Sequence, residues 1–115
     1  MKVYIAGPMS GLPNFNRAAF NHAHFHLWSK GHIVLNPARL PDGLTQGEYM
    51  DICLAMLRCA DAIYMLEGWE HSAGARAENA LAEKLEMATG SGMARSGVVG
   101  LLLRAGPGMP RAPQL

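Results

Sequence analysis

The stretch Asp61–Leu85, DAIYMLEGWEHSAGARAENALAEKL, decides the fold of this 115-residue chain. Its opening residues are almost wholly apolar, which is typical of a strand buried on both faces of a parallel sheet. A polar loop with Gly68 and Gly74 follows, and the residues after it have helical spacing. We therefore predict a strand at Asp61–Leu66 and a helix at Ala75–Ala88. The inner face of this helix is predicted to hold Ala77, Leu81 and Leu85.

Two similar units of strand and helix precede this stretch. Strands are predicted at Lys2–Ala6 and His32–Leu35, because both runs are mostly apolar and end at a turn that contains proline. Helices are predicted at Phe15–Lys30 and at Thr45–Ala60, where Glu48 completes a capping box. The predicted inner faces hold Ala19, Phe20, Ala23 and Leu27 in the first helix and Tyr49, Ile52, Cys53, Met56 and Leu57 in the second. The order predicts an α/β fold, a flavodoxin- or Rossmann-like three-layer sandwich around a small parallel sheet.

The character of the chain changes after Ala88. Nine of the last 26 residues are glycine or proline, against eleven of the first 89. Among them only Val98–Leu103 has the residues of a strand, and we take it as a candidate fourth strand. We expect one α/β domain at 1–103 and a disordered, Gly/Pro-rich tail at 104–115.

Composition narrows the classes of function. Half of the residues are hydrophobic, and the formal net charge of +1 gives no reason to expect a nucleic-acid or membrane surface. Cys53 and Cys59 are expected to be buried, reduced thiols, since two cysteines six residues apart on a helix make neither a disulfide framework nor a metal site. His22 and His26 lack an evident third metal ligand, so we expect an exposed polar face there. No segment has the length of a membrane span or a secretory signal, and we expect a cytoplasmic protein without metal or cofactor.

The candidate site lies where the first and third strands end. A parallel sheet binds ligands beyond the carboxyl ends of its strands, at the point where strand order reverses. The loops Gly7–Asn14 and Glu67–Gly74 would line that crevice. Glu78 follows the second loop and would point into it, although a solvated glutamate in a first helical turn is the alternative. Ser72 lies at a helix N-terminus that favours an anion such as phosphate, and a plain N-cap is its other reading.

Two blocks of residues carry a family resemblance. VYIAGPMSG at Val3–Gly11 and ADAIYMLEGWEHSAGARAE at Ala60–Glu78 resemble the nucleoside 2-deoxyribosyltransferase-like superfamily, and more narrowly its phage and bacterial DUF4406 branch. The resemblance covers about residues 2–87. The chain departs from the pattern after Met87, because relatives usually pass directly into a fourth apolar strand. Here the residues are ATGSG, so the end is either an insertion before Val98–Leu103 or a divergent or frame-shifted tail that leaves the sheet edge bare.

The resemblance implies a function and a set of residues. Superfamily members cleave or exchange the N-glycosidic bond of nucleosides or nucleotides. Glu78 matches their nucleophile, and Ser72 matches the serine that holds the 5′-phosphate. The matched first loop would border sugar and base with Gly7, Pro8 and Met9, Gly74 belongs to the phosphate loop, and Asp51 is the nearest equivalent of an aspartate that assists the glutamate. Such enzymes are commonly homo-oligomers, so we expect a dimer or tetramer.

Three hypotheses of different classes follow. The first is an enzyme that acts on a nucleoside or nucleoside 5′-monophosphate through the Glu78 nucleophile, by hydrolysis or by transfer to a second base. The second is a module of phage origin that sequesters a nucleotide without turnover. The third is a scaffold whose crevice is vestigial.

Overall fold

The computed structural model describes residues 1–92, which form four parallel strands and three α-helices. The strands β1 (Lys2–Ala6), β2 (Ile33–Leu35), β3 (Ala62–Leu66) and β4 (Ala88–Gly92) lie in the order β2-β1-β3-β4. The helices are α1 (Arg17–Ser29), α2 (Gln46–Arg58) and α3 (Ala73–Lys84), with short 3-10 turns at Pro13–Asn16, Pro37–Arg39 and Trp69–His71. The order reverses between β1 and β3. This arrangement confirms the predicted Rossmann-like α/β class.

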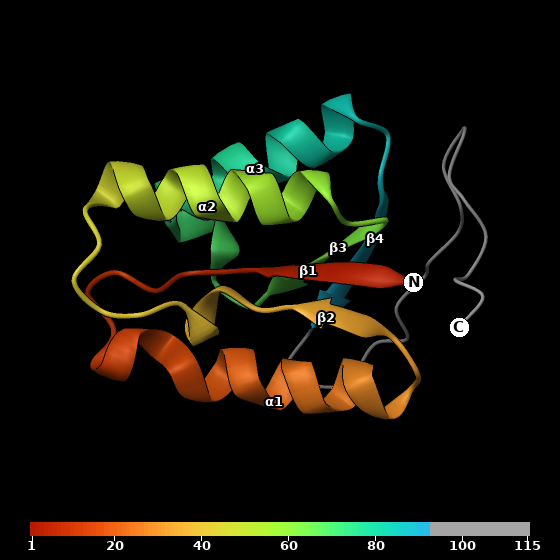
Figure 1. The fold of residues 1–115 in the computed structure, drawn as a ribbon, viewed down its shortest axis with the longest axis horizontal. Helices are drawn as coiled ribbons and strands as arrows, with labels where there is room; N and C mark the ends of the chain where they lie inside the picture. Colours follow the sequence, from red (N-terminus) through yellow and green to blue (C-terminus); the bar gives the residue numbers. More distant parts are fainter. Residues whose placement is uncertain (93–115) are drawn as a thin grey trace.

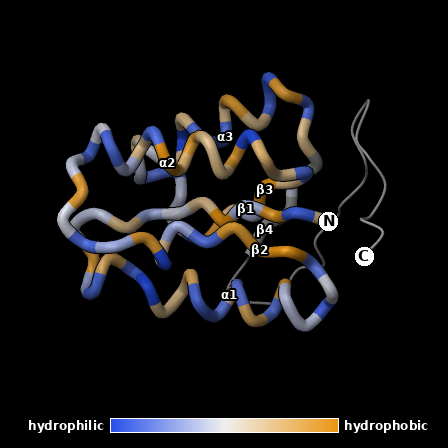
Figure 2. Tube along the Cα trace, viewed as in Figure 1, coloured by the Kyte–Doolittle hydropathy of each residue, from blue (hydrophilic) through white to orange (hydrophobic). Residues whose placement is uncertain are grey.

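The helices cover the sheet on both faces (Figure 1). Alternate residues of β1 point to opposite layers, since successive side chains of a strand face opposite ways. Val3 and Ile5 pack with α1, whose buried face holds Phe20, Ala23 and Leu27 as predicted. Tyr4 and Ala6 pack with Cys53 and Leu57 of α2 and Ala82 of α3. Along α1 and α2 the hydrophobic and hydrophilic residues alternate, as expected of helices with one buried face (Figure 2).

The described residues include a fourth strand, β4, at a position where the sequence did not predict one. β4 pairs in parallel with β3 from Ala62 opposite Ala88 to Leu66 opposite Gly92. A sheet ladder is made by backbone N–H and C=O groups, which every residue except proline has, so the small residues ATGSG can pair without an apolar pattern. The candidate strand at 98–103 and the tail at 104–115 lie outside the described residues.

Two predicted inner faces need correction. The buried residues of α3 are Ala75, Glu78 and Ala82, whereas Ala77 and Leu85 are exposed and the helix ends at Lys84 instead of Ala88. The helix is rich in alanine, so apolar periodicity identifies its inner face poorly. On α2, Ile52 is exposed, and Cys59 is also exposed instead of buried. Cys59 is the C-cap, where the chain leaves the helix.

The start of α2 agrees with the prediction. The Thr45 hydroxyl accepts a hydrogen bond from the Glu48 N–H at 3.0 Å, and the Glu48 carboxylate accepts one from the Thr45 N–H at 2.9 Å. This reciprocal capping box satisfies two N–H groups that the first turn would otherwise leave without partners. It thereby fixes the residue at which α2 begins. Within residues 1–92 no helix is long and apolar enough to cross a membrane.

Candidate functional site

A cavity of about 290 Å³ opens where β1 and β3 end. Its walls combine the end of β1, the starts of all three helices and the loop before α2. The lining residues include Tyr4, Gly7, Met9, Phe15, Arg17, Asp42, Tyr49, Cys53, Ser72, Gly74 and Glu78. The volume is at the low end of the range of pockets that hold small molecules. The cavity therefore occupies the predicted crevice.

Glu78 is the buried acid of this cavity. It is 6% exposed and lies on the inner face of α3, between Ala75 and Ala82. The Tyr4 hydroxyl donates a hydrogen bond of 2.6 Å to its Oε2. Because alternate residues of β1 face α3, the strand presents Tyr4 to the carboxylate. The structure thus excludes the alternative reading of Glu78 as a solvated side chain.

The surroundings of Glu78 change its ionisation. Burial raises the pKa of its carboxyl to about 7, although the hydrogen bond from Tyr4 opposes the rise. Burial also raises the pKa of Tyr4, and the Glu78 charge adds to the effect, so the hydroxyl stays a donor. Near neutral pH the cavity therefore holds a carboxyl group that can both accept and release a proton.

A thiol lies beside this pair. Burial raises the pKa of Cys53 to about 11, the Tyr4 hydroxyl acts against this rise, and the Glu78 charge adds to it. The side chain is therefore a neutral thiol at physiological pH, whereas a nucleophilic cysteine needs a lowered pKa. Cys53 contributes packing to the cavity wall.

Ser72 caps α3. Its hydroxyl oxygen accepts a hydrogen bond of 3.2 Å from the Ala75 N–H, which is the plain N-cap role considered above. A hydroxyl that accepts still has its own O–H to donate. Ser72 and Gly74 both line the cavity at the positive end of the helix. This end of the cavity suits an anionic group.

The first loop borders the cavity only in part. Gly7 and Met9 line it, whereas Pro8 is not among the lining residues. A side chain at Gly7 would place its Cβ 2.7 Å from the Cβ of Leu66, so only glycine allows β1 and β3 to end this close together. The Pro8 carbonyl instead accepts a hydrogen bond of 2.9 Å from Asn16 Nδ2. Pro8 thus holds the first loop through this hydrogen bond, outside the lining of the cavity.

The structure separates Asp51 from the other predicted residues. Asp51 is exposed on α2 and does not line the cavity, although Met50 and Cys53 of the same helix do. Spacing along a helix did not settle which way this side chain points. The cavity brings together Gly7, Met9, Ser72, Gly74 and Glu78, while Pro8 and Asp51 lie outside its wall.

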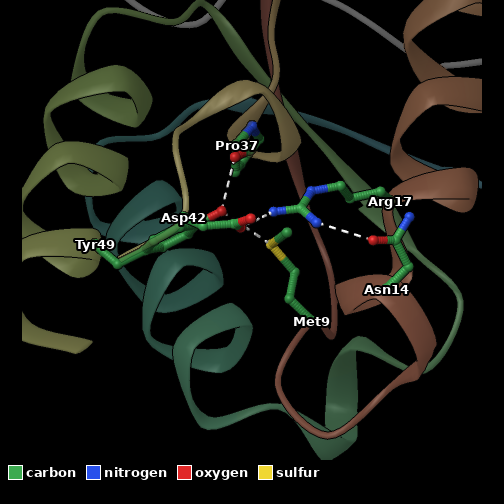
Figure 3. A network of polar contacts seen from close by, with 6 residues as sticks. All are labelled: Met9, Asn14, Arg17, Pro37, Asp42 and Tyr49. Carbon is green, nitrogen blue, oxygen red and sulfur yellow. Dashed lines mark hydrogen bonds and ion pairs between the residues drawn. The ribbon is translucent and has the colours of Figure 1, made fainter. Parts of the chain in front are cut away.

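Several cavity residues, among them Tyr4, Arg17 and Asp42, were not predicted from the sequence. Figure 3 shows a polar network in which Arg17 donates to Asn14 Oδ1 at 2.9 Å and to Asp42. The Tyr49 hydroxyl lies 2.7 Å from the Pro37 carbonyl oxygen and 3.4 Å from the Met9 sulfur. These groups come from the first loop, the start of α1, the segment between β2 and α2, and the first turns of α2, so no single sequence motif contains them. Tyr4 was available as a signal, since its hydroxyl is the single side-chain polar atom in the run Val3–Ala6.

No metal centre is evident in the part of the chain that the structure describes. Within residues 1–92, no three side chains of His, Cys, Asp or Glu gather closely enough to hold an ion.

The chain is similar to a known protein family. A family model described as "Domain of unknown function (DUF4406)" matches residues 1–89. The matched range contains every residue that lines the cavity. No curated protein matches the chain.

Proposed function

We propose that this chain, which belongs to the DUF4406 family, cleaves or exchanges the N-glycosidic bond of a nucleoside or nucleoside 5′-monophosphate. We also propose that the chain is a member of the nucleoside 2-deoxyribosyltransferase-like superfamily. The observation that carries it is the buried Glu78 carboxylate, which lies in the cavity with its Oε2 held by the Tyr4 hydroxyl at 2.6 Å.

Glu78 would act as the nucleophile. Its Oε1 forms a bond to C1′ of the sugar while the C1′–N bond breaks, and the base leaves with the electron pair and takes a proton from solvent water. The carboxylate also stabilises the oxocarbenium character that develops on the sugar. Water or a second base then attacks C1′ and frees Glu78. The hydrogen bond from Tyr4 engages Oε2, so it would orient Oε1 toward the sugar.

Ser72 would hold the 5′-phosphate. Its hydroxyl and the N-terminus of α3 both favour an anion, and both lie on the cavity wall that carries Glu78. Glu78 follows the N-cap Ser72 by six residues, roughly 1.7 turns of α3, so a phosphate at one and a sugar at the other fit a single nucleotide. Gly7 and Met9 would border the sugar from the end of β1.

The test is release of free base. Purified protein is incubated with a panel of ribo- and deoxyribonucleosides and their 5′-monophosphates, and the products are separated by chromatography. Glu78→Gln is expected to abolish release, whereas Glu83→Gln, an exposed position on the same helix, is the matched control. The proposal fails if no substrate releases base, or if Glu78→Gln releases it as fast as the wild-type protein.

A nucleotide-sequestering module is the second candidate. The observation in its favour is the pKa of Glu78, which burial raises to about 7. A protonated carboxyl cannot attack C1′, but it can donate a hydrogen bond to a ligand. This candidate predicts saturable nucleotide binding by calorimetry that survives Glu78→Gln, with no product formed.

We also propose a cytoplasmic homo-oligomer, a dimer or a tetramer. Phe25 and Trp28 support this assembly, because they are 63% and 65% exposed one turn apart on α1. Light scattering coupled to gel filtration measures the mass. A monomeric mass at micromolar concentration would contradict the proposal, and Trp28→Glu is expected to weaken the assembly without unfolding α1.

A further inference from the structure

We propose that Arg17 selects the base, by donating to an oxo group and a neighbouring ring nitrogen, so that a 6-oxopurine nucleotide is preferred to a 6-aminopurine one. The inference rests on the proposed function for its ligand class and for the place of the sugar at Glu78. It adds a residue that determines specificity on the opposite side of the cavity.

Arg17 lies on the opposite side of the cavity from Glu78 and Ser72. Glu78 and Ser72 belong to α3, whereas Arg17 is the first residue of α1, which covers the other face of the sheet. A phosphate at Ser72 and a sugar at Glu78 would take the α3 side of the cavity. The base would then extend toward the α1 side, where Arg17 and the loop with Asp42 form the wall (Figure 3).

Contacts with three neighbouring side chains hold the Arg17 side chain in one orientation. Its guanidinium donates to Asn14 Oδ1 at 2.9 Å and to Asp42, and lies 5.2 Å from the centre of the Phe15 ring. The side chain is 24% exposed. A guanidinium has five N–H donors in one plane, so these two contacts leave further donors for a ligand. A planar fork of donors held in this way matches two neighbouring acceptor atoms.

The charge of Arg17 is partly balanced by a neighbouring carboxylate. The ion pair with Asp42 offsets the positive charge of Arg17, so the site attracts a phosphate less than a free arginine would. Its donors still match neutral acceptors. The O6 and N7 atoms of a 6-oxopurine are such a pair, and arginine commonly recognises them in this way. An amino group at position 6 presents a donor in place of the oxo acceptor, so the arginine N–H that faces it is left unpaired, although N7 can still accept from the other.

The experiment measures binding, which needs no turnover. Dissociation constants of inosine and adenosine 5′-monophosphates (IMP and AMP) are determined by calorimetry with the full chain. The wild-type protein is expected to bind IMP roughly tenfold to hundredfold more tightly than AMP. Arg17→Met is expected to bring the two constants within about twofold. Arg17→Lys, which keeps the charge and loses the fork, is expected to lose most of the preference, and it decides the result if Arg17→Met does not fold.

Controls and contrary outcomes separate this inference from the proposed function. Arg58→Gln, at the exposed end of α2, is expected to keep the wild-type preference. Equal or reversed affinities in the wild-type protein, absence of binding to both purines, or a preference unchanged in both Arg17 variants would overturn the inference. So would a uniform loss for both monophosphates with inosine binding unchanged, which would make Arg17 a phosphate ligand. If Glu78 is needed for base release but IMP is not preferred to AMP, only the inference about Arg17 is overturned. If IMP is preferred but no base is released, only the enzymatic function is overturned.

Discussion

At the scale of single residues, the ionisation of Glu78 links the stability of the fold to the proposed function. Its carboxyl lies in a wall made of apolar groups and the Tyr4 hydroxyl, and burial raises its pKa from 4.5 to about 7. The folded protein therefore binds the proton more tightly than the unfolded chain does. The resulting stability is fully present below pH 4.5 and is lost as the pH rises through about 7.

Glu78→Gln should remove this pH dependence. Glutamine has nearly the same shape and cannot ionise, so its free energy of unfolding should lack the fall between pH 4.5 and pH 7. The difference between wild type and variant should change by about 2–3 kcal/mol across that range, in favour of the variant at high pH. Urea unfolding at a series of pH values measures it. Parallel pH profiles for the two proteins would contradict the prediction.

Tyr4→Phe should shift the pH profile of base release. The Tyr4 hydroxyl lowers the pKa of Glu78 by stabilising the carboxylate, so its removal raises that pKa. If the ionised form is the nucleophile, the rate at pH 7 should fall roughly fivefold to tenfold and recover at higher pH. The control is Tyr64→Phe, a buried position on the α1 side of the sheet that does not line the cavity. A rate reduced equally at every pH would show that the hydroxyl only maintains structure.

At the scale of elements, the ends of β1 and β3 approach each other closely at Gly7, a residue of the cavity wall. Gly7→Ala would place a methyl group 2.7 Å from Leu66 Cβ, so one of the two strands has to shift. We expect a loss of about 1–3 kcal/mol of unfolding free energy, measured by urea unfolding. Gly47→Ala in α2 is the matched control. A Cβ at Gly47 would lie 4.0 Å from its nearest neighbour, and alanine favours a helix. A Gly7→Ala protein as stable as wild type would contradict the close approach.

β4 shows how an element can form without an apolar pattern. Its residues pair with β3 along the whole length of that strand. This places β3 inside the sheet, with β1 on one side and β4 on the other. The loop that follows β3 and leads to Ser72 and Glu78 thus leaves from an interior strand, and interior strands are held on both edges.

At the scale of the whole molecule, the cavity joins the two helical layers. A nucleotide that contacts Arg17 on the α1 side and Ser72 on the α3 side would link them, and it would bind only the folded chain. At a ligand concentration of about 100 times the dissociation constant, the stabilisation is about 2.7 kcal/mol. We expect the melting temperature to rise by roughly 10 °C for a domain of this size.

Differential scanning fluorimetry with nucleoside monophosphates checks this expectation. Inorganic phosphate at the same concentration controls for a general effect of anions. A melting temperature that no nucleotide changes would favour the third hypothesis, a scaffold with a vestigial crevice.

The sequence by itself determined the local features of this protein. Apolar runs such as Lys2–Ala6 identified the interior strands, and the Thr45 capping box identified a helix start, because each depends on neighbouring residues. The order of elements was then enough to place a crevice at the ends of β1 and β3 and to place Glu78 and Ser72 beside it.

Only the tertiary structure decided what depends on contacts between distant residues. It paired Tyr4 with Glu78 across 74 positions of sequence, turned Asp51 outward, and brought Arg17 to the wall opposite α3. It also placed the fourth strand at Ala88–Gly92, where backbone pairing with β3 needs no apolar side chains. The pKa of Glu78 also depends on such distant contacts, because it reflects the groups that pack around the carboxyl. The composition of the chain does not determine it.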